Sequence, residues 1–276
     1  MTRPGVLLTM SQPASAGTSA EATAEHERWY QRHHIPDVLR RCGLTSARQY
    51  RLAVDDEQLA PTLTGDVEHR YVTVYEIDDV SRVGELREGL REVAAMPSSR
   101  DGDAAAADPA ADLIATVYEQ ISENTTKATL PPGIEAPRPG RVSDGPPGAV
   151  IIFSRPSGDD AEAEYHRWYD GVHTGETLLL PGYTRSRRFR PAPADEQALP
   201  DRVDTRSRRF LTIYDLENVR YVPHARAAMA WFREVSVQFT SPAVSYPPSC
   251  WTFEQLFETA IRGDEPRTPK SIRRES

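Results

Sequence analysis

The chain contains two copies of one sequence pattern, and this repeat limits the possible folds more than any other feature. Arg28-Trp29-Tyr30 with His34 returns 139 positions later as Arg167-Trp168-Tyr169 with His173. The same spacing joins Gly43 with Gly182, Thr45 with Thr184, Arg48 with Arg187, Asp56-Glu57-Gln58 with Asp195-Glu196-Gln197, Pro61 with Pro200, Thr73 with Thr212 and Tyr75 with Tyr214. A period of this length is one small domain and not a solenoid unit. We therefore expect the 276 residues to be a tandem duplication.

Both copies predict the same order of strands and helices. Apolar or alternating runs rich in β-branched and aromatic residues predict strands, and apolar residues at i and i+4 predict helices. The first copy reads as strand 6–10, helix 22–34, strands 46–52 and 69–77, helix 80–95 and strand 113–121, and the second as strand 150–153, helix 161–173, strands 184–190 and 208–216, helix 222–235 and strand 251–257. Pro36 and Gly175 are expected to end or kink the first helix of each copy. The predicted class is α+β, with β-α-β-β-α-β order, the ferredoxin-like pattern, in each repeat.

Composition changes along the chain predict the domain boundaries. Residues 1–130 are expected to form the first ferredoxin-like repeat and 148–261 the second. Between them, 131–147 is rich in proline and glycine and is predicted to be a linker. The charged segment 262–276 is expected to be a disordered tail.

Charge and composition exclude several classes of protein. Lys+Arg 33 against Asp+Glu 41 gives a net charge of −8, which argues against binding to nucleic acid or to an anionic membrane surface. No apolar run approaches the roughly 18 residues of a membrane span, so a cytoplasmic protein is expected. The two cysteines, Cys42 and Cys250, suffice neither for a disulfide framework nor for a four-ligand zinc site. The sequence lacks a Gly-rich phosphate loop and a G-x-S-x-G elbow.

The motif at the end of the first predicted helix resembles a known family. Trp29-Tyr30-x-x-x-His34-Ile35-Pro36-Asp37, followed by Gly43 and a strand, is similar to the signature of the dimeric α/β-barrel superfamily, and most similar to its EthD-like branch. The resemblance covers both copies. It implies that the two ferredoxin-like units pack sheet to sheet into a barrel within one chain. It also implies a cavity between the sheet and the helices of each unit, in a superfamily that includes cyclases, isomerases, dehydratases, monooxygenases and haem enzymes.

The two repeated histidines are the leading candidates for acid–base catalysis. His34 and His173 stand near the end of a predicted helix, where an imidazole can exchange protons near neutral pH. Asp37 and Glu176 follow three residues later and could orient them. The alternative is that each histidine bonds the backbone at the helix break. The first copy is the expected active half, because it keeps Pro36 of the family motif where the second copy has Gly175.

Other repeated side chains are candidates for holding a substrate. Tyr75 is a candidate catalytic phenol that polarises a carbonyl, although strand tyrosines commonly pack in cores. The remaining substrate-binding candidates are Trp29, Tyr30, Arg48, Tyr50, Trp168, Arg187 and Tyr214. The tryptophans could form a stacking wall or belong to the core, and the arginines could hold a carboxylate or enolate or form ordinary salt bridges.

No cofactor is expected from the sequence. His34 and Asp37 could begin a metal site, but a third ligand is not evident. Haem, which occurs in the superfamily, is disfavoured because no single proximal histidine can be identified.

The function expected from these features is that of a cofactor-independent enzyme, with uncertain chemistry of lyase or isomerase type. It would act as a cyclase, dehydratase or isomerase on an aromatic or polyketide-like substrate through proton transfer by His34. Two alternatives stay open: a cofactor-free monooxygenase of an aromatic or quinol substrate, and a non-catalytic small-molecule binding or accessory protein. The partner is a small molecule, and the fused pseudo-dimer could associate further into a homodimer.

Overall fold

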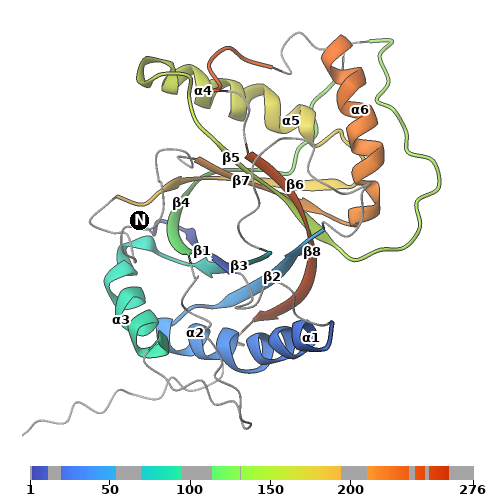
Figure 1. Cartoon of the computed structure of the whole chain (residues 1–276). Helices are drawn as coiled ribbons and strands as arrows, with labels where there is room; N and C mark the ends of the chain where they lie inside the picture. The colour runs from blue at the N-terminus through green and yellow to red at the C-terminus, as the bar shows by residue number, and fades with distance from the viewer. Residues whose placement is uncertain are drawn as a thin grey trace, which may run out of the picture.

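The strands of the chain close into one barrel. The computed structural model describes residues 2–11, 20–53, 70–94, 114–130, 132–193, 210–235, 240–245 and 249–260. Eight described strands follow one another around the barrel in the order β1-β3-β2-β8-β5-β7-β6-β4, and every neighbouring pair is antiparallel. Figure 1 looks into the barrel and shows helices α1, α2 and α3 on one side and α4, α5 and α6 on the other.

Each repeat contributes half of the barrel and one layer of helices. The first repeat consists of β1 Gly5–Ser11, α1 Ala20–Trp29, the π-helical segment η1 Tyr30–His34, α2 Ile35–Cys42, β2 Ser46–Leu52, β3 Tyr71–Ile77, the short 3₁₀ helix η2 Val80–Arg82, α3 Val83–Ala94 and β4 Ile114–Asn124. The second consists of β5 Gly148–Ser154, η3 Asp159–Ala161, α4 Glu162–Trp168, η4 Tyr169–His173, α5 Thr174–Thr177, β6 Tyr183–Pro191, β7 Phe210–Leu216, η6 Val219–Tyr221, α6 Val222–Val235 and β8 Ser249–Ala260. The predicted pair of ferredoxin-like repeats is confirmed.

The two halves join at two seams where a last strand meets the second strand of the other repeat. β4 pairs with β6, and β8 pairs with β2. Each half therefore lacks a free sheet edge, because the other half covers it. This exchange explains how one chain builds a barrel from two units that would otherwise each present an open sheet.

Ion pairs across the seams repeat the symmetry of the sequence. Arg48 Nη1 lies 3.5 Å from Asp215 Oδ1, and the equivalent Arg187 Nη1 lies 2.7 Å from Glu76 Oε1. Arg51 with Glu254 and Arg190 with Glu119 form a second equivalent set. In all four pairs the arginine comes from one repeat and the carboxylate from the other. The charges thus favour pairing between halves over closure of either half on itself.

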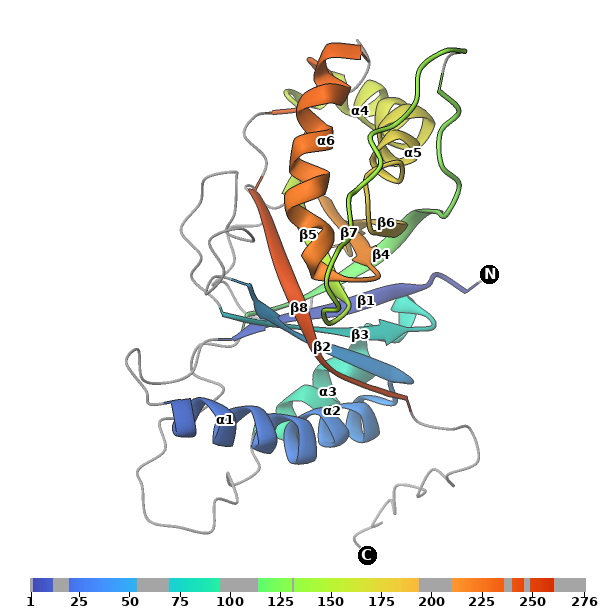
Figure 2. The ribbon, with the colours of Figure 1, turned by 90° about the vertical axis from the view of Figure 1, so that its right-hand side faces the viewer.

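Strand alternation divides the side chains into a barrel core and two outer cores. Successive strand residues point to opposite faces, so a core shared by strands of both repeats lies inside the barrel. The inner core contains Val6, Leu8, Met10, Tyr50, Leu52, Val72, Val74, Tyr118, Ala149, Ile151, Phe153, Phe189, Leu211, Ile213, Trp251 and Phe253. The outer faces pack against the helices of their own repeat. Figure 2 shows the barrel between these two helix layers.

The first helix of each repeat passes through the predicted break. In η1 the Ile35 N–H donates to the Tyr30 carbonyl, five residues back, and Pro36 then stands in the first turn of α2, where its missing N–H is not needed. Of the two expected outcomes, an end or a kink, the helix does not end here: α2 continues to Cys42, and Gly43 ends it with a φ of 63°. The second repeat has the same π-helical turn, with Thr174 N–H on the Tyr169 carbonyl.

The segment after β4 packs against the second repeat beside Gly175. Ala128 N–H donates to the Gly175 carbonyl at 2.9 Å, and the Ala128 Cβ would lie 3.4 Å from any Cβ added at Gly175. Further on, Asn218 Nδ2 donates to the Ser143 carbonyl. The segment between β4 and β5 therefore packs against the second repeat, in van der Waals reach of a Cβ at position 175.

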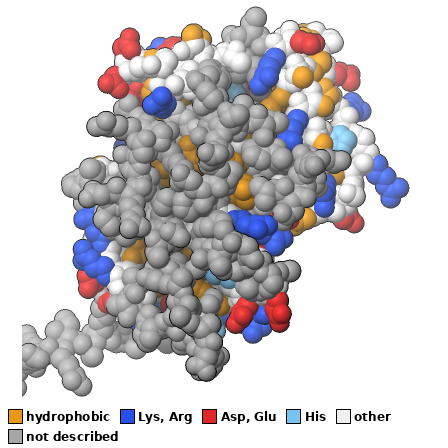
Figure 3. Space-filling model, in the orientation of Figure 1, with side chains coloured by type: hydrophobic (Ala, Val, Ile, Leu, Met, Phe, Trp, Pro, Cys, Tyr) orange, Lys and Arg blue, Asp and Glu red, His pale blue; other side chains and the backbone are white. Residues whose placement is uncertain are grey.

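The described surface carries charges of both signs. On the face in Figure 3, positive and negative side chains alternate over the part of the surface that is not grey. No helix in the described ranges combines the length and apolar character needed to cross a bilayer. The predicted tail at 262–276 lies outside the described residues.

Candidate functional site

Two equivalent groups of polar side chains lie between the sheet and the helices, one in each repeat. The first-repeat cluster consists of Tyr30, Tyr75, Thr9, Thr73 and Ser11, all buried. The second-repeat cluster consists of Tyr169, Tyr214, Thr177, Ser154, Ser186 and Thr212, also buried. Polar groups are costly in an otherwise apolar layer unless they bond one another or a ligand. These clusters are therefore the candidate sites.

His34 lies against the first-repeat cluster. Its ring centroid is 4.4 Å from that of Tyr30 and 5.7 Å from that of Trp29. Burial lowers the pKa of His34 to about 4, with the charge of Asp37 opposing the shift and that of His26 adding to it. The imidazole is therefore neutral at pH 7 and can accept a proton.

Two phenols meet beside this imidazole. Burial raises the pKa of Tyr30, although the neighbouring Thr9, Thr73 and Tyr75 oppose the shift. Burial also raises the pKa of Tyr75 well above its usual value, and the neighbouring Tyr30 adds to that shift. Both hydroxyls are buried and have no hydrogen-bond partner among the described residues. Both phenols thus stay protonated and can donate to a developing oxyanion.

A pair of neutral amide side chains lies on the helix-facing side of the sheet in the first repeat. Gln31 Nε2 donates to Gln49 Oε1 at 3.0 Å, and Gln49 is fully buried. Gln49 pairs in register with Thr73 on the neighbouring strand, which places both on the helix-facing side with Tyr75.

The second repeat has an ion pair at the same two positions. Arg188, the equivalent of Gln49, donates from Nη1 to Oδ1 of Asp170, the equivalent of Gln31, at 2.6 Å. The Arg188 guanidinium carbon lies 4.3 Å from the ring centroid of Tyr169 and 5.4 Å from that of Tyr165. The two sites have therefore diverged in charge.

Hydrogen bonding also differs between the sites. Tyr169 hydroxyl donates to Ser154 Oγ at 3.2 Å, and Ser154 Oγ lies 2.7 Å from the Tyr165 hydroxyl. His173 stacks on Trp168 with centroids 4.3 Å apart and rings inclined by 19°, whereas its ring is perpendicular to that of Tyr169. The first repeat keeps its histidine closest to a phenol, and the second keeps it closest to an indole.

Three of the substrate-binding candidates lie on the other side of the sheet. Tyr50 belongs to the barrel core, and Arg48 and Arg187 form ion pairs at one end of the barrel interior. Because side chains alternate along a strand, these residues face away from the histidines. Trp29, Tyr30, Trp168 and Tyr214 do lie on the helix-facing side with His34 or His173.

The two carboxylates expected to orient the histidines are placed differently from each other. Asp37 Oδ1 accepts a hydrogen bond from Arg40 at 2.7 Å, and Asp37 influences His34 through its charge. Glu176 lies in α5 and is partly exposed. Within the described ranges, no group of three or more His, Cys, Asp or Glu side chains is arranged to hold a metal ion.

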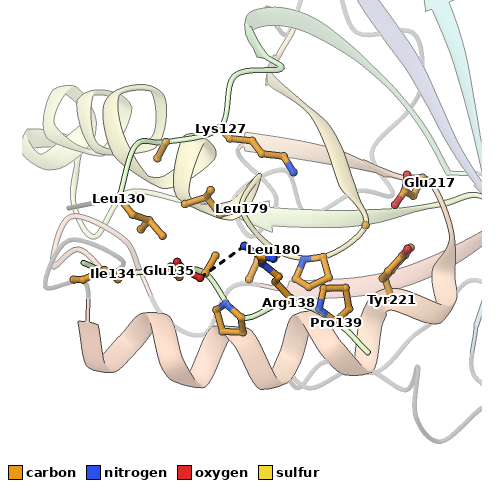
Figure 4. Close-up of a pocket in the computed structure, with 15 residues that line it drawn as sticks. Lys127, Leu130, Ile134, Glu135, Arg138, Pro139, Leu179, Leu180, Glu217 and Tyr221 are labelled. Carbon is orange, nitrogen blue, oxygen red and sulfur yellow. Dashed lines mark ion pairs between the residues drawn. The ribbon is translucent and has the colours of Figure 1, made fainter. Parts of the chain in front are cut away.

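A separate surface pocket lies where the linker crosses the second repeat. It measures about 610 Å³ and includes Lys127, Leu130, Leu180, Glu217 and Tyr221 in its lining. In the view of Figure 4, Leu130 lies at one end and Tyr221 at the other, and an ion pair between Glu135 and Arg138 lies between them. None of the expected catalytic residues lines it.

The sequence analysis missed Gln31, Gln49, Asp170, Arg188 and the hydroxyls around the tyrosines. A signal was present, because strand alternation puts the cross-strand neighbours of a helix-facing Tyr75 on the same face. Comparing the two copies at position 49 and its equivalent 188 would then have shown the change from amide to guanidinium.

The low pKa of His34 predicts a pH-dependent stability. The unfolded chain binds a proton at His34 near pH 6.5 and the folded chain only near pH 4, so stability should fall as the pH drops from about 6.5 to about 4. We expect His34 to account for a loss of about 2 kcal/mol, allowing for its partial exposure. Urea unfolding of the wild type and of His34→Gln at pH 7.0, 5.5 and 4.5 measures it. Parallel curves for the two proteins would contradict the assignment.

The closed barrel with a helix layer on each side gives the chain the dimeric α/β-barrel fold, with both units in one polypeptide. Solved structures of other proteins share this fold, among them the following two. A protein from Fusobacterium nucleatum that bears a monooxygenase assignment is 7% identical, with 94% of this chain and 95% of that chain covered and a TM-score of 0.50. An anthrone oxidase-like protein is 12% identical, with 94% of each chain covered and a TM-score of 0.50.

At such identities the likeness shows the fold alone. No protein-family model and no curated protein sequence matches the chain. The EthD-like branch of the superfamily therefore stays a prediction.

Proposed function

We propose that the chain is a cofactor-independent enzyme that removes a proton from a flat aromatic or polyketide-like molecule in the first repeat. The observation that carries this proposal is a neutral imidazole, His34, against a buried pair of protonated phenols, Tyr30 and Tyr75. A base beside hydroxyl donors is the arrangement needed to ionise a carbon next to a carbonyl.

In the proposed mechanism, His34 accepts the proton while the phenols stabilise the oxygen that becomes negative. The new enolate lies beside the imidazolium, and this attraction favours the protonated histidine despite its burial. Asp37 acts in the same direction through its charge. Trp29 flanks the imidazole and supplies an aromatic surface for a planar ligand. Cyclisation, dehydration or isomerisation would follow from the same anion.

Oxygenation is a second candidate outcome, favoured by the names of two solved structures that share this fold. For anthrone, the enolate would pass electrons to O₂, and one anthrone and one O₂ would give one anthraquinone and one water. Deprotonation is the first step of either outcome, so the role of His34 does not depend on which one follows.

Anthrone in D₂O tests the proposal. Under argon, the wild type is expected to accelerate exchange of the protons next to the aromatic rings at C10, followed by NMR. In air, oxygen uptake with anthraquinone formation would indicate the oxygenase, and exchange without uptake would indicate cyclase or isomerase chemistry. Binding of anthrone without any exchange would overturn the proposal in favour of a non-catalytic binding protein.

A further inference from the structure

The two sites of the chain differ in charge at matched positions. Gln31 and Gln49 in the first repeat correspond to Asp170 and Arg188 in the second, and each pair joins the helical layer to the sheet through one direct hydrogen bond. The duplication thus keeps the geometry and changes the chemistry. Such a replacement alters what a site can bind more than how it folds.

The negative and positive ends of this ion pair have unequal access to water. The Asp170 side chain is 43% exposed and also accepts from Ser122 Oγ at 2.6 Å, whereas the Arg188 side chain is 1% exposed. Solvent screens the exposed carboxylate, but the buried guanidinium is screened little. The inner side of the pair is therefore positive.

The Nε–H of Arg188 is available to a ligand. Nη1 bonds Asp170, and Nη2 lies 3.2 Å from His166 Nδ1, which accepts because Arg188 can only donate. Nε has no hydrogen-bond acceptor among the residues that the structure describes, although it is fully buried. A buried charged donor without an acceptor is costly, and a ligand oxygen would relieve that cost.

Hydroxyl groups surround the same space. Burial raises the pKa of Tyr214, and Thr177, Ser186 and the charge of Arg188 oppose that shift. The hydroxyls of Tyr214, Thr177 and Ser186 are buried and have no hydrogen-bond partner among the described residues. The Tyr169 hydroxyl donates to Ser154 Oγ, whereas the hydroxyls of Tyr30 and Tyr75 in the first repeat have no hydrogen-bond partner among the described residues. The second repeat thus offers donors for an anion, and the phenol beside its histidine is already hydrogen-bonded.

We propose that the second repeat is an anion-binding site for a small aromatic carboxylate, held by Arg188 Nε and the hydroxyls of Tyr214 and Ser186. Other ionisable groups near Arg188 are Asp170 and His166. Glu162 Oε1 lies 3.7 Å from Nε2 of His166. The rings of Tyr169 and Trp168 supply the aromatic contact. The inference rests on the proposed function only for the flat aromatic shape of the ligand.

The test compares 2-naphthoate with 2-naphthol, which share one ring system and differ in charge. Equilibrium dialysis at pH 7 is expected to show the wild-type chain binding naphthoate more tightly than naphthol. The double variant Asp170→Gln/Arg188→Gln copies the amide pair of the first repeat and leaves no unpaired charge. It should bind naphthoate at least tenfold more weakly and change naphthol binding by less than twofold.

A second pair of variants keeps the test decisive if the double variant does not fold. Tyr214→Phe and Ser186→Ala remove one hydroxyl each without changing charge, and each should weaken naphthoate binding about threefold to tenfold. Equal weakening of both ligands, or naphthoate affinity unaffected by all these changes, would overturn the proposal. The measurement is binding and not turnover, so its failure is separate from a failure of anthrone exchange at His34.

Discussion

Replacing His34 by glutamine is expected to slow anthrone proton exchange by about 10²-fold to 10⁴-fold, the usual contribution of a positioned general base. Glutamine fills similar space and can hydrogen-bond, but its amide cannot accept a proton at neutral pH. Because Tyr30, Tyr75 and Trp29 keep their places, anthrone should still bind. Exchange by NMR under argon and dialysis of anthrone, on the same preparation, measure the two quantities.

The equivalent substitution His173→Gln is the matched control. His173 stacks on Trp168 at 4.3 Å, and the hydroxyl of the neighbouring Tyr169 is already hydrogen-bonded to Ser154 Oγ. Its effect on exchange should be at least tenfold smaller than that of His34→Gln. A larger effect from His173→Gln would move the catalytic role to the second repeat, and equal small effects would leave neither histidine as the base.

Most of the fold could be predicted because the repeat and the strand pattern are local in sequence. Matches such as Tyr75 with Tyr214 identify a duplication directly, and alternation identifies the strands. What could not be predicted was the passage of the helix through Pro36. That outcome depends on a π-helical turn over Tyr30–His34, and the second repeat has the equivalent turn over Tyr169–His173. A proline in the sequence does not indicate that such a turn precedes it. A proline breaks a helix whose backbone N–H groups bond to carbonyls four residues back. In the wider π-helical turn the bond reaches five residues back, so the pattern of backbone hydrogen bonds before Pro36 is different.

The site could be predicted in part, and the reason is again geometric. His34, Tyr30 and Trp29 were identified from the motif, because all three lie within two turns of one helix. Arg48 and Tyr50 were grouped with them on residue type, but strand alternation sends these two into the barrel interior. The Asp170–Arg188 pair could not be predicted as a contact from one copy alone, since it joins a helix to a strand 18 residues away.

Replacing Glu76 by glutamine should destabilise the folded chain by about 3 kcal/mol, the lower end for breaking a buried ion pair. The Arg187 side chain is 3% exposed, and both carboxylate oxygens of Glu76 accept from its Nη1, at 2.7 and 2.9 Å. A glutamine retains one accepting oxygen but leaves the buried cation without a countercharge. Because this pair crosses the seam between the repeats, the loss should appear in global unfolding by urea at pH 7.

Asp215→Asn changes the symmetry-equivalent pair and is the control. Asp215 forms ion pairs with both Arg48 and Arg185, at 3.5 and 3.1 Å. Arg48 also lies 3.1 Å from Glu258, and Arg185 also lies 3.7 Å from Glu123. Each arginine therefore keeps a carboxylate when Asp215 loses its charge. Both arginine side chains are more than 20% exposed, and partly exposed pairs contribute about 1 kcal/mol or less. Equal losses in the two variants would show that exposure does not decide the strength of these pairs. A loss below 1 kcal/mol in Glu76→Gln would show that the buried Arg187 charge is compensated by something other than Glu76.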